Sequence, residues 1–214
     1  MRTWTLHSLG LALDSQGKWA EAVEAYQEVL QGYHELGDRS NEGRTLNNLG
    51  SVYQAQGRWE QAIECCQQDL AICRELGDRR GEGATLNNLG IVYRAQGRWE
   101  QAIECCQQDL TICRELGDRH GESQTLNNLG ETYTMQGCWQ EAKGYFDQSL
   151  PICRELGDRL GEAYVLHNLG GGTRGRDNWM RPLPATRKRC ASVASWKPGP
   201  MPGRRCMPWR RCTC

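Results

Sequence analysis

The sequence predicts an all-α fold in which helix pairs stack along most of the chain. The first observation is a 40-residue repeat: a 35-residue segment that begins at Thr45 recurs from Thr85 with only three differences. Looser copies begin at Thr5 and Thr125, and a fifth starts at Val165 and then loses the pattern. The second observation is that the apolar residues of each copy recur at helical spacing. The copies therefore predict the same two helices, and neither helix can bury its apolar face without neighbours.

The first helix of a unit is predicted from Leu46, Leu49, Gly50 and Tyr53. These residues fall at i, i+3, i+4 and i+7, which is one face of a helix. Gly57 ends this helix, because glycine enters the left-handed conformation at little cost.

The second helix carries an apolar stripe formed by Trp59, Ala62, Cys66, Leu70, Cys73 and Leu76. It ends at Gly77, and we expect Asp78 to cap the following helix by accepting a backbone N–H bond. Gly50 and Ala62 are small where the two helices cross, so the backbones can approach closely. Each buried large apolar side chain contributes roughly 1.5–3 kcal/mol, which makes a stack of such units stable.

Residues 171–214 differ from the preceding residues in charge and proline content. Residues 1–170 hold 15 Lys and Arg against 25 Asp and Glu, a net charge of −10. Residues 171–214 hold 11 basic residues against Asp177 alone, a net charge of +10, and six of the seven prolines. We place a domain boundary here: residues 1–170 hold about four units and the first helix of a fifth, and residues 171–214 are expected to be disordered.

Six of the seven Trp and Cys residues of the tail fall on apolar registers of the repeat. Trp179 has the register of Trp59, and Cys206 has that of Leu46. Trp and Cys codons both begin with TG, so a one-base shift turns them into Leu, Val or Met codons. We interpret residues from about 171 onward as repeat sequence read out of frame, rather than as an evolved zinc-binding or nucleic-acid-binding tail. Restoring one base between codons 170 and 177 should extend the repeats.

Residues 1–170 resemble the tetratricopeptide repeat, in the long variant of Pins-type scaffold proteins, kinesin light chains and many bacterial repeat proteins. The resemblance rests on the run Leu46, Leu49, Gly50, Tyr53, Gly57 and Ala62, followed four residues later by Tyr26, Cys66, Cys106 or Phe146 in successive units. It implies a right-handed solenoid of antiparallel helix pairs whose concave face binds a peptide or a partner protein.

The resemblance also implies which flank of the first helices lines the groove. The predicted binding residues are Asn47, Ser51, Gln54, Asn87, Ile91, Arg94, Asn127, Glu131 and Thr134. The asparagine is the same in all three units, so a row of amides would bond a peptide backbone while the varied positions read its side chains. The alternative is that exposed positions simply drift.

Asp69 and Asp109 depart from the family pattern, which has a small residue at this register, like Ser149 in the fourth unit. A buried carboxylate without a partner is costly, so we expect a nearby donor and take the Asn88 amide as the candidate. A structural role is favoured over a functional one.

Signals of catalysis are weak. The four histidines have neither HxxxH nor HExxH spacing. The repeated cysteines lack a CxxC pair and are better interpreted as small core residues. We expect no catalytic residues, no metal and no cofactor.

The expected function is a non-catalytic protein–protein interaction scaffold for a peptide or protein of unknown identity. Two alternatives stay open: a regulatory or sensor segment truncated from a larger signalling protein, and nucleic-acid binding through the basic tail. No stretch approaches 18 apolar residues, so we expect no membrane partner, and we expect no specific nucleic acid. Cysteines placed as core residues favour the cytoplasm.

Overall fold

The computed structural model describes residues 2–174, and these residues form nine helices and no strand. The helices are α1 Arg2–Ser15, α2 Trp19–Leu36, α3 Arg39–Ala55, α4 Trp59–Leu76, α5 Arg79–Ala95, α6 Trp99–Leu116, α7 Arg119–Gln136, α8 Trp139–Leu156 and α9 Arg159–Arg174. Residues 171–174, which were predicted to begin the tail, continue α9. Residues 175–214, on which the remaining disorder and the register of the predicted tail fall, lie outside the described residues.

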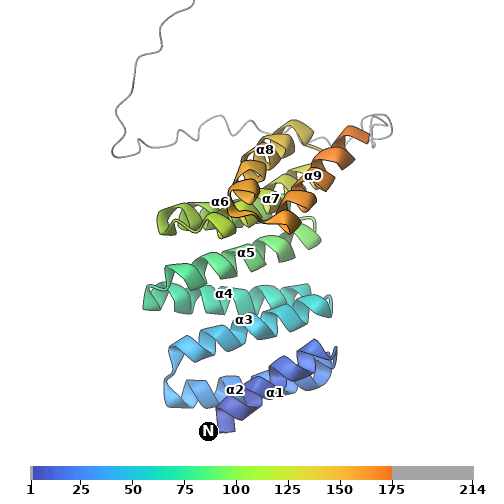
Figure 1. The fold of residues 1–214 in the computed structure, drawn as a ribbon. Coiled ribbons are helices and arrows are strands. Elements are labelled where there is room, and N and C mark those ends of the chain that lie inside the picture. The colour runs from blue at the N-terminus through green and yellow to red at the C-terminus, as the bar shows by residue number, and fades with distance from the viewer. Residues whose placement is uncertain (1, 175–214) are drawn as a thin grey trace, which may run out of the picture. The chain divides into compact units, whose positions relative to one another are not determined.

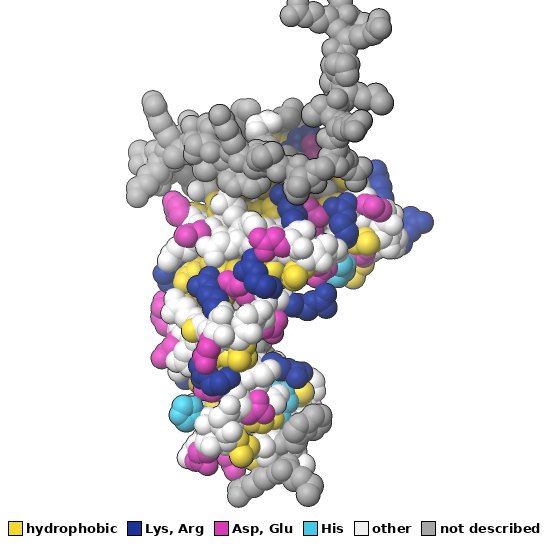
Figure 2. Space-filling model, turned by 90° about the vertical axis from the view of Figure 1, so that its left-hand side faces the viewer, with side chains coloured by type: hydrophobic (Ala, Val, Ile, Leu, Met, Phe, Trp, Pro, Cys, Tyr) yellow, Lys and Arg dark blue, Asp and Glu magenta, His cyan; other side chains and the backbone are white. Residues whose placement is uncertain are grey.

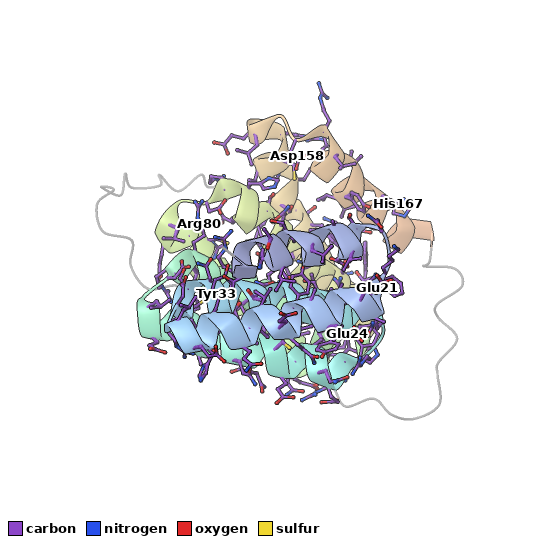
Figure 3. The ribbon with its side chains drawn as sticks, turned by 90° about the horizontal axis from the view of Figure 1, so that it is seen from below. Glu21, Glu24, Tyr33, Arg80, Asp158 and His167 are labelled. Carbon is purple, nitrogen blue, oxygen red and sulfur yellow. The ribbon has the colours of Figure 1, made fainter. Side chains whose placement is uncertain are left out.

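Each helix packs against the next one along the chain, so the described residues build a stack of antiparallel pairs from α1 to α9 (Figure 1). The odd-numbered helices also contact one another in sequence, from α1·α3 to α7·α9. Within residues 2–174 the Cα atoms of any two even-numbered helices stay more than 8 Å apart, although the side chains of Arg74 on α4 and Gln108 on α6 reach each other. The stack is therefore tighter along the odd-numbered helices, and we take their side as the concave face. The predicted all-α solenoid is confirmed, and a view from the α1 end shows successive pairs overlying one another (Figure 3).

The loops between units combine a glycine and an aspartate. Gly77 follows α4 in the left-handed conformation at φ 69°, and the side chain of Asp78 accepts the backbone N–H of Gly81 at 2.9 Å. The glycines and aspartates at 37–38, 117–118 and 157–158 repeat this arrangement. The predicted end of the second helix and the predicted cap of the next helix are confirmed.

A glycine allows the two helices of a unit to cross closely. A methyl group added at Gly50 would lie 3.3 Å from Cys66 Sγ and 3.5 Å from the carbonyl oxygen of Ala62. The predicted crossing of Gly50 and Ala62 is therefore correct. In the fourth unit Gly130 faces the ring of Phe146 instead, and an added methyl there would overlap the ring.

The buried core differs from the predicted stripe at its C-terminal end. Ala62, Cys66 and Cys73 are buried as predicted, but 49% of Leu76 is exposed, so its assignment to the core was wrong. Leu76 lies in the last turn of α4, where the chain leaves the stack and its neighbours are also exposed. Ile72, which is 3% exposed, fills the core one turn earlier.

Candidate functional site

The nine predicted binding residues lie on three neighbouring odd-numbered helices. The structure places Asn47, Ser51 and Gln54 on α3, Asn87, Ile91 and Arg94 on α5, and Asn127, Glu131 and Thr134 on α7. Within each helix the middle residue follows the asparagine by one turn. Ser51 is exposed, and Ile91 and Glu131 are partly buried. The three helices, which contact one another in sequence, therefore carry the predicted residues at matching registers.

The asparagines form a ladder that joins successive units. Asn88 Nδ2 donates to Asn47 Oδ1 at 2.9 Å, and Asn128 Nδ2 donates to Asn87 Oδ1 at 2.7 Å. Asn168 continues the ladder by donating at 3.2 Å to Asn127 Oδ1. The side-chain oxygens of Asn47, Asn87 and Asn127 therefore already accept hydrogen bonds within the protein. The N–H groups of these amides are the atoms considered below for binding a ligand.

Sequence reasoning missed the second asparagine of each unit. The donors of this ladder are Asn88, Asn128 and Asn168. Asn48 ends the ladder, because its Nδ2 lies 3.4 Å from Nε2 of His7, which has the register of Asn47 in the first unit. The signal was present in the repeated LNNLG, where both asparagines are retained in successive copies. What the repeat could not reveal is that residues 41 apart make the pair.

The varied positions among the predicted binding residues differ in chemistry from unit to unit. One register carries Ser51, Ile91 and Glu131 in succession, which changes from polar to apolar to acidic. Glu131 is paired with Arg94 at 2.5 Å and accepts from Asn127 Nδ2 at 3.0 Å. The acidic end of the row is therefore held in place by its neighbours.

The donor predicted for the buried aspartates was wrong. Asn88 belongs to the ladder, and Asp69 Oδ2 instead lies 2.5 Å from the hydroxyl of Thr85 on the next helix. Asp69 and its copy Asp109 are each 4% exposed. Thr85 and Thr125, which begin successive repeats, each lie sixteen residues after an aspartate. Their hydroxyl groups point toward the preceding helix and so reach Asp69 and Asp109.

A second ladder of ion pairs runs along the loops between units. Arg79 bridges Glu82 on its own helix and Glu115 on α6, both at 2.5 Å, while Arg74 reaches Glu82 at 2.8 Å. Burial alone would raise the pKa of Glu82, but the hydrogen bonds from Arg74 and Arg79 lower it below its usual range. The guanidinium groups are exposed, so these pairs orient the units more than they stabilise them. The surface in Figure 2 accordingly mixes basic, acidic and apolar side chains.

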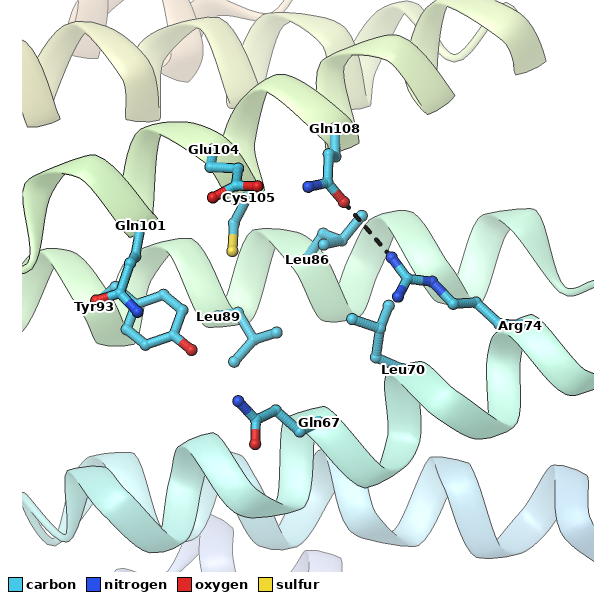
Figure 4. A pocket seen from close by; sticks show the side chains of 10 residues that line it. All are labelled: Gln67, Leu70, Arg74, Leu86, Leu89, Tyr93, Gln101, Glu104, Cys105 and Gln108. Atoms are coloured by element: carbon cyan, nitrogen blue, oxygen red, sulfur yellow. Dashed lines mark hydrogen bonds between the residues drawn. The ribbon is translucent and has the colours of Figure 1, made fainter.

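A small pocket opens between α4 and α6, above α5 (Figure 4). Its lining residues are Gln67, Leu70, Arg74, Leu86, Leu89, Tyr93, Gln101, Glu104, Cys105 and Gln108. None of the nine predicted binding residues is among them, because α5 contributes another of its faces, with Leu86, Leu89 and Tyr93. In the next unit the corresponding space holds the stacked rings of Tyr133 and Tyr145, 5.4 Å apart, and Tyr145 has the register of Cys105.

The thiols of the repeats lie in the core. Burial raises the pKa of Cys66 to about 12 and that of Cys105 to about 11, so both are protonated and poor nucleophiles at neutral pH. Within residues 2–174 no group of three or more His, Cys, Asp or Glu side chains is placed to hold a metal ion. No helix of the described part is long and apolar enough to cross a membrane.

Comparison with known proteins matches almost the whole described region. Family models described as tetratricopeptide repeats match residues 2–36 and, in overlapping segments, residues 41–115, 82–137 and 121–176. No curated protein matches the chain.

Solved structures match the fold at low sequence identity. BtubC from P. vanneervenii is 24% identical with a TM-score of 0.68, and the match covers 72% of this chain and 64% of BtubC. A putative kinesin light chain from Podosopora anserina is 20% identical with a TM-score of 0.65, covering 82% of this chain and 90% of that one. Aspartyl phosphate phosphatase F from Bacillus subtilis is 14% identical with a TM-score of 0.75, covering 81% and 48%. These likenesses show the fold alone.

Proposed function

Because the chain belongs to the tetratricopeptide repeat family, we propose that it is a non-catalytic scaffold that binds an extended peptide in the concave groove of α3, α5 and α7. The ligand is a free peptide or an extended segment of a partner protein. The observation that carries the proposal is the row of Ser51, Ile91 and Glu131, whose side chains change from unit to unit beside a ladder of amides that does not change.

The ladder leaves hydrogen-bond donors for a ligand. A side-chain amide nitrogen carries two hydrogens. Within the protein, Asn127 donates one of them to Glu131 and Asn47 donates one to Asp69. Because the Oδ1 atoms accept from the next unit, each amide is fixed in one orientation. The remaining N–H groups can donate to peptide carbonyl oxygens at any register, while the varied side chains select the sequence.

The rest of the proposal concerns class and location. The family is generally a non-catalytic scaffold, and we propose no catalytic activity, no cofactor and no membrane or specific nucleic-acid partner for this chain. We place the protein in the cytoplasm, since the repeat cysteines, such as Cys66 and Cys106, are free thiols buried in the core.

A library of linear peptides displayed on phage, selected against the whole chain, tests the proposal. The selected peptide is then measured by isothermal titration calorimetry against two double variants. Ser51→Lys with Ile91→Lys places two cations in the groove and should weaken binding at least about tenfold, which is about 1.4 kcal/mol.

The matched control adds the same two charges to the outer side. Ala71 and Thr111 are exposed and stand at equivalent registers of α4 and α6. Ala71 lies nine residues after the buried Ala62, which is half a turn away from the packed face at 100° per residue. Ala71→Lys with Thr111→Lys should leave the affinity unchanged. Equal loss in both variants, or none in the groove variant, would reject the groove.

A further inference from the structure

Tyr53, Tyr93 and Tyr133 stand at one register of α3, α5 and α7, and the middle one differs from the others in its surroundings. The Tyr53 hydroxyl accepts a hydrogen bond from Gln27 Nε2 at 3.4 Å. The Tyr133 hydroxyl is hydrogen-bonded to Tyr145 on α8, whose ring stacks on that of Tyr133 at an interplanar angle of 12°. Within the described part of the chain no group hydrogen-bonds the Tyr93 hydroxyl, and the space beside it is the pocket between α4 and α6.

The pocket has the size and the apolar lining that an aromatic ring needs. Its volume is about 220 Å³, and an apolar cavity of about 150 Å³ is enough to bind benzene. Leu86 and Leu89 line it from α5 and are only 2% and 3% exposed, and the partly buried Leu70 lines it from α4. Three exposed glutamines of α4 and α6 complete the lining (Figure 4). A ligand group would therefore enter past amides and rest on leucines.

The fourth unit shows which side chain fills such a space. Cys105 and Tyr145 stand at the same register of α6 and α8. The ring of Tyr145 extends over Tyr133, whereas the shorter Cys105 side chain leaves the space beside Tyr93 open. Arg98 lies over the Tyr93 ring at 4.6 Å but is not among the lining residues, so it does not close the pocket. A phenol ring supplied from outside would take the open space, with its hydroxyl beside that of Tyr93.

The charges at the pocket favour a cation next to that ring. Arg74 and Glu104 are the charged residues of the lining. Arg74 is already engaged, because it pairs with Glu82 at 2.8 Å and donates to Gln108 at 3.5 Å. Glu104 is exposed, and no basic side chain of residues 2–174 pairs with it. A Lys or Arg beside the ligand's ring would supply the missing partner, since charges attract over about 8 Å at physiological ionic strength.

We propose that the pocket between α4 and α6 is a second binding site, which takes a tyrosine side chain of a partner protein that is flanked in sequence by Lys or Arg. The phenol ring packs on the three leucines, its hydroxyl hydrogen-bonds that of Tyr93, and the flanking cation pairs with Glu104. None of the nine predicted groove residues lines the pocket. The site is therefore separate from the concave groove and does not depend on the function proposed for it.

Nuclear magnetic resonance of the whole chain with labelled leucine methyl groups tests the site, and the probe is the peptide acetyl-Lys-Tyr-Lys-amide. We expect saturable shifts of the methyl groups of Leu70, Leu86 and Leu89. The peptide with Glu in place of both Lys residues should bind more weakly, and added salt should reduce the difference because it screens Glu104. Absence of saturable shifts at these leucines overturns the proposal, and equal binding of the two peptides at low salt overturns the role of Glu104.

The hydrogen bond is tested by removing one hydroxyl at a time. The peptide acetyl-Lys-Phe-Lys-amide should bind the wild type about fivefold more weakly than the tyrosine peptide, which is the effect of one hydrogen bond worth about 1 kcal/mol. Tyr93→Phe keeps the ring and should bind the two peptides equally. The same preference in the wild type and in Tyr93→Phe would contradict the assigned contact.

The pocket itself is tested by filling it as the fourth unit does. Cys105→Tyr places the chain's own ring in the space and should weaken binding of the tyrosine peptide at least about tenfold. The matched control Thr111→Tyr adds the same side chain at an exposed position of α6 and should keep the affinity. Undiminished binding in Cys105→Tyr, or an equal loss in Thr111→Tyr, overturns the site. If Cys105→Tyr does not fold, the comparison of the wild type with Tyr93→Phe still decides.

Discussion

Leu126 and Leu166 occupy the same register in successive units but differ in burial. Replacing each by alanine removes the same atoms, so a difference in the loss of stability reports the difference in packing. Leu126 on α7 is 0% exposed, whereas Leu166 on α9 is 45% exposed. Replacing either leucine by alanine removes three carbons, worth about 2.4 kcal/mol of transfer free energy when fully buried. At Leu126 an enclosed cavity adds to this loss, so the expected cost is about 2–5 kcal/mol. At Leu166 only about half of the transfer term applies and no enclosed cavity forms, so we expect about 1 kcal/mol.

The assay is urea denaturation of the whole chain followed by far-ultraviolet circular dichroism. A drop in midpoint at constant slope reports a change in stability, and Leu126→Ala should shift it several times further than Leu166→Ala. Because stacked repeats need not unfold in one step, amide hydrogen exchange should also show the Leu126 effect on α7 and its neighbours and the Leu166 effect on α9 alone. Equal losses would refute the reasoning, since Leu166 would then be buried in solution by residues outside the described part.

Two further predictions concern local sterics and capping. Gly130→Ala should cost about 1–3 kcal/mol in the same denaturation, because the added methyl overlaps the buried ring of Phe146; Gly144→Ala, where nothing lies within 4 Å of the added carbon, should be stabilising by about 1 kcal/mol through helix propensity. Asp118→Ala should cost about 1 kcal/mol by removing the acceptor for the Gly121 N–H, and Asp118→Asn should restore most of that loss on a thermal melt.

The repeat in the sequence was enough to predict the helices, their order and the loop chemistry. Gly77 and Asp78 could be assigned because each acts through its own backbone or a backbone group three residues away. Leu76 was misassigned because helical spacing gives a direction around the helix but does not show where a neighbouring helix stops.

Contacts between units were harder to predict than contacts within them. The Asn47 and Asn88 side chains meet across 41 residues, and their pairing depends on the offset between stacked helices. That offset also decided the partner of Asp69, which is a hydroxyl of the next helix rather than the predicted amide. The family resemblance proposed the nine binding residues, but only the stacked helices show which of the asparagine amide atoms are already hydrogen-bonded within the protein.

The contacts between units use the same residue types at each junction. The binding surface can therefore be shortened or lengthened by one whole unit at a time. The amide, acid–hydroxyl and ion-pair contacts recur at nearly the same distances in consecutive junctions: Asn88–Asn47 and Asn128–Asn87, Asp69–Thr85 and Asp109–Thr125, Arg74–Glu82 and Arg114–Glu122. Excision of residues 79–118 would bring together partners of the same residue types at every one of these contacts. Unequal recombination between the near-identical coding segments can therefore shorten or lengthen the binding surface by one unit without any compensating substitution. An array of this kind can adapt to ligands of different length by copy number, before any single side chain has changed.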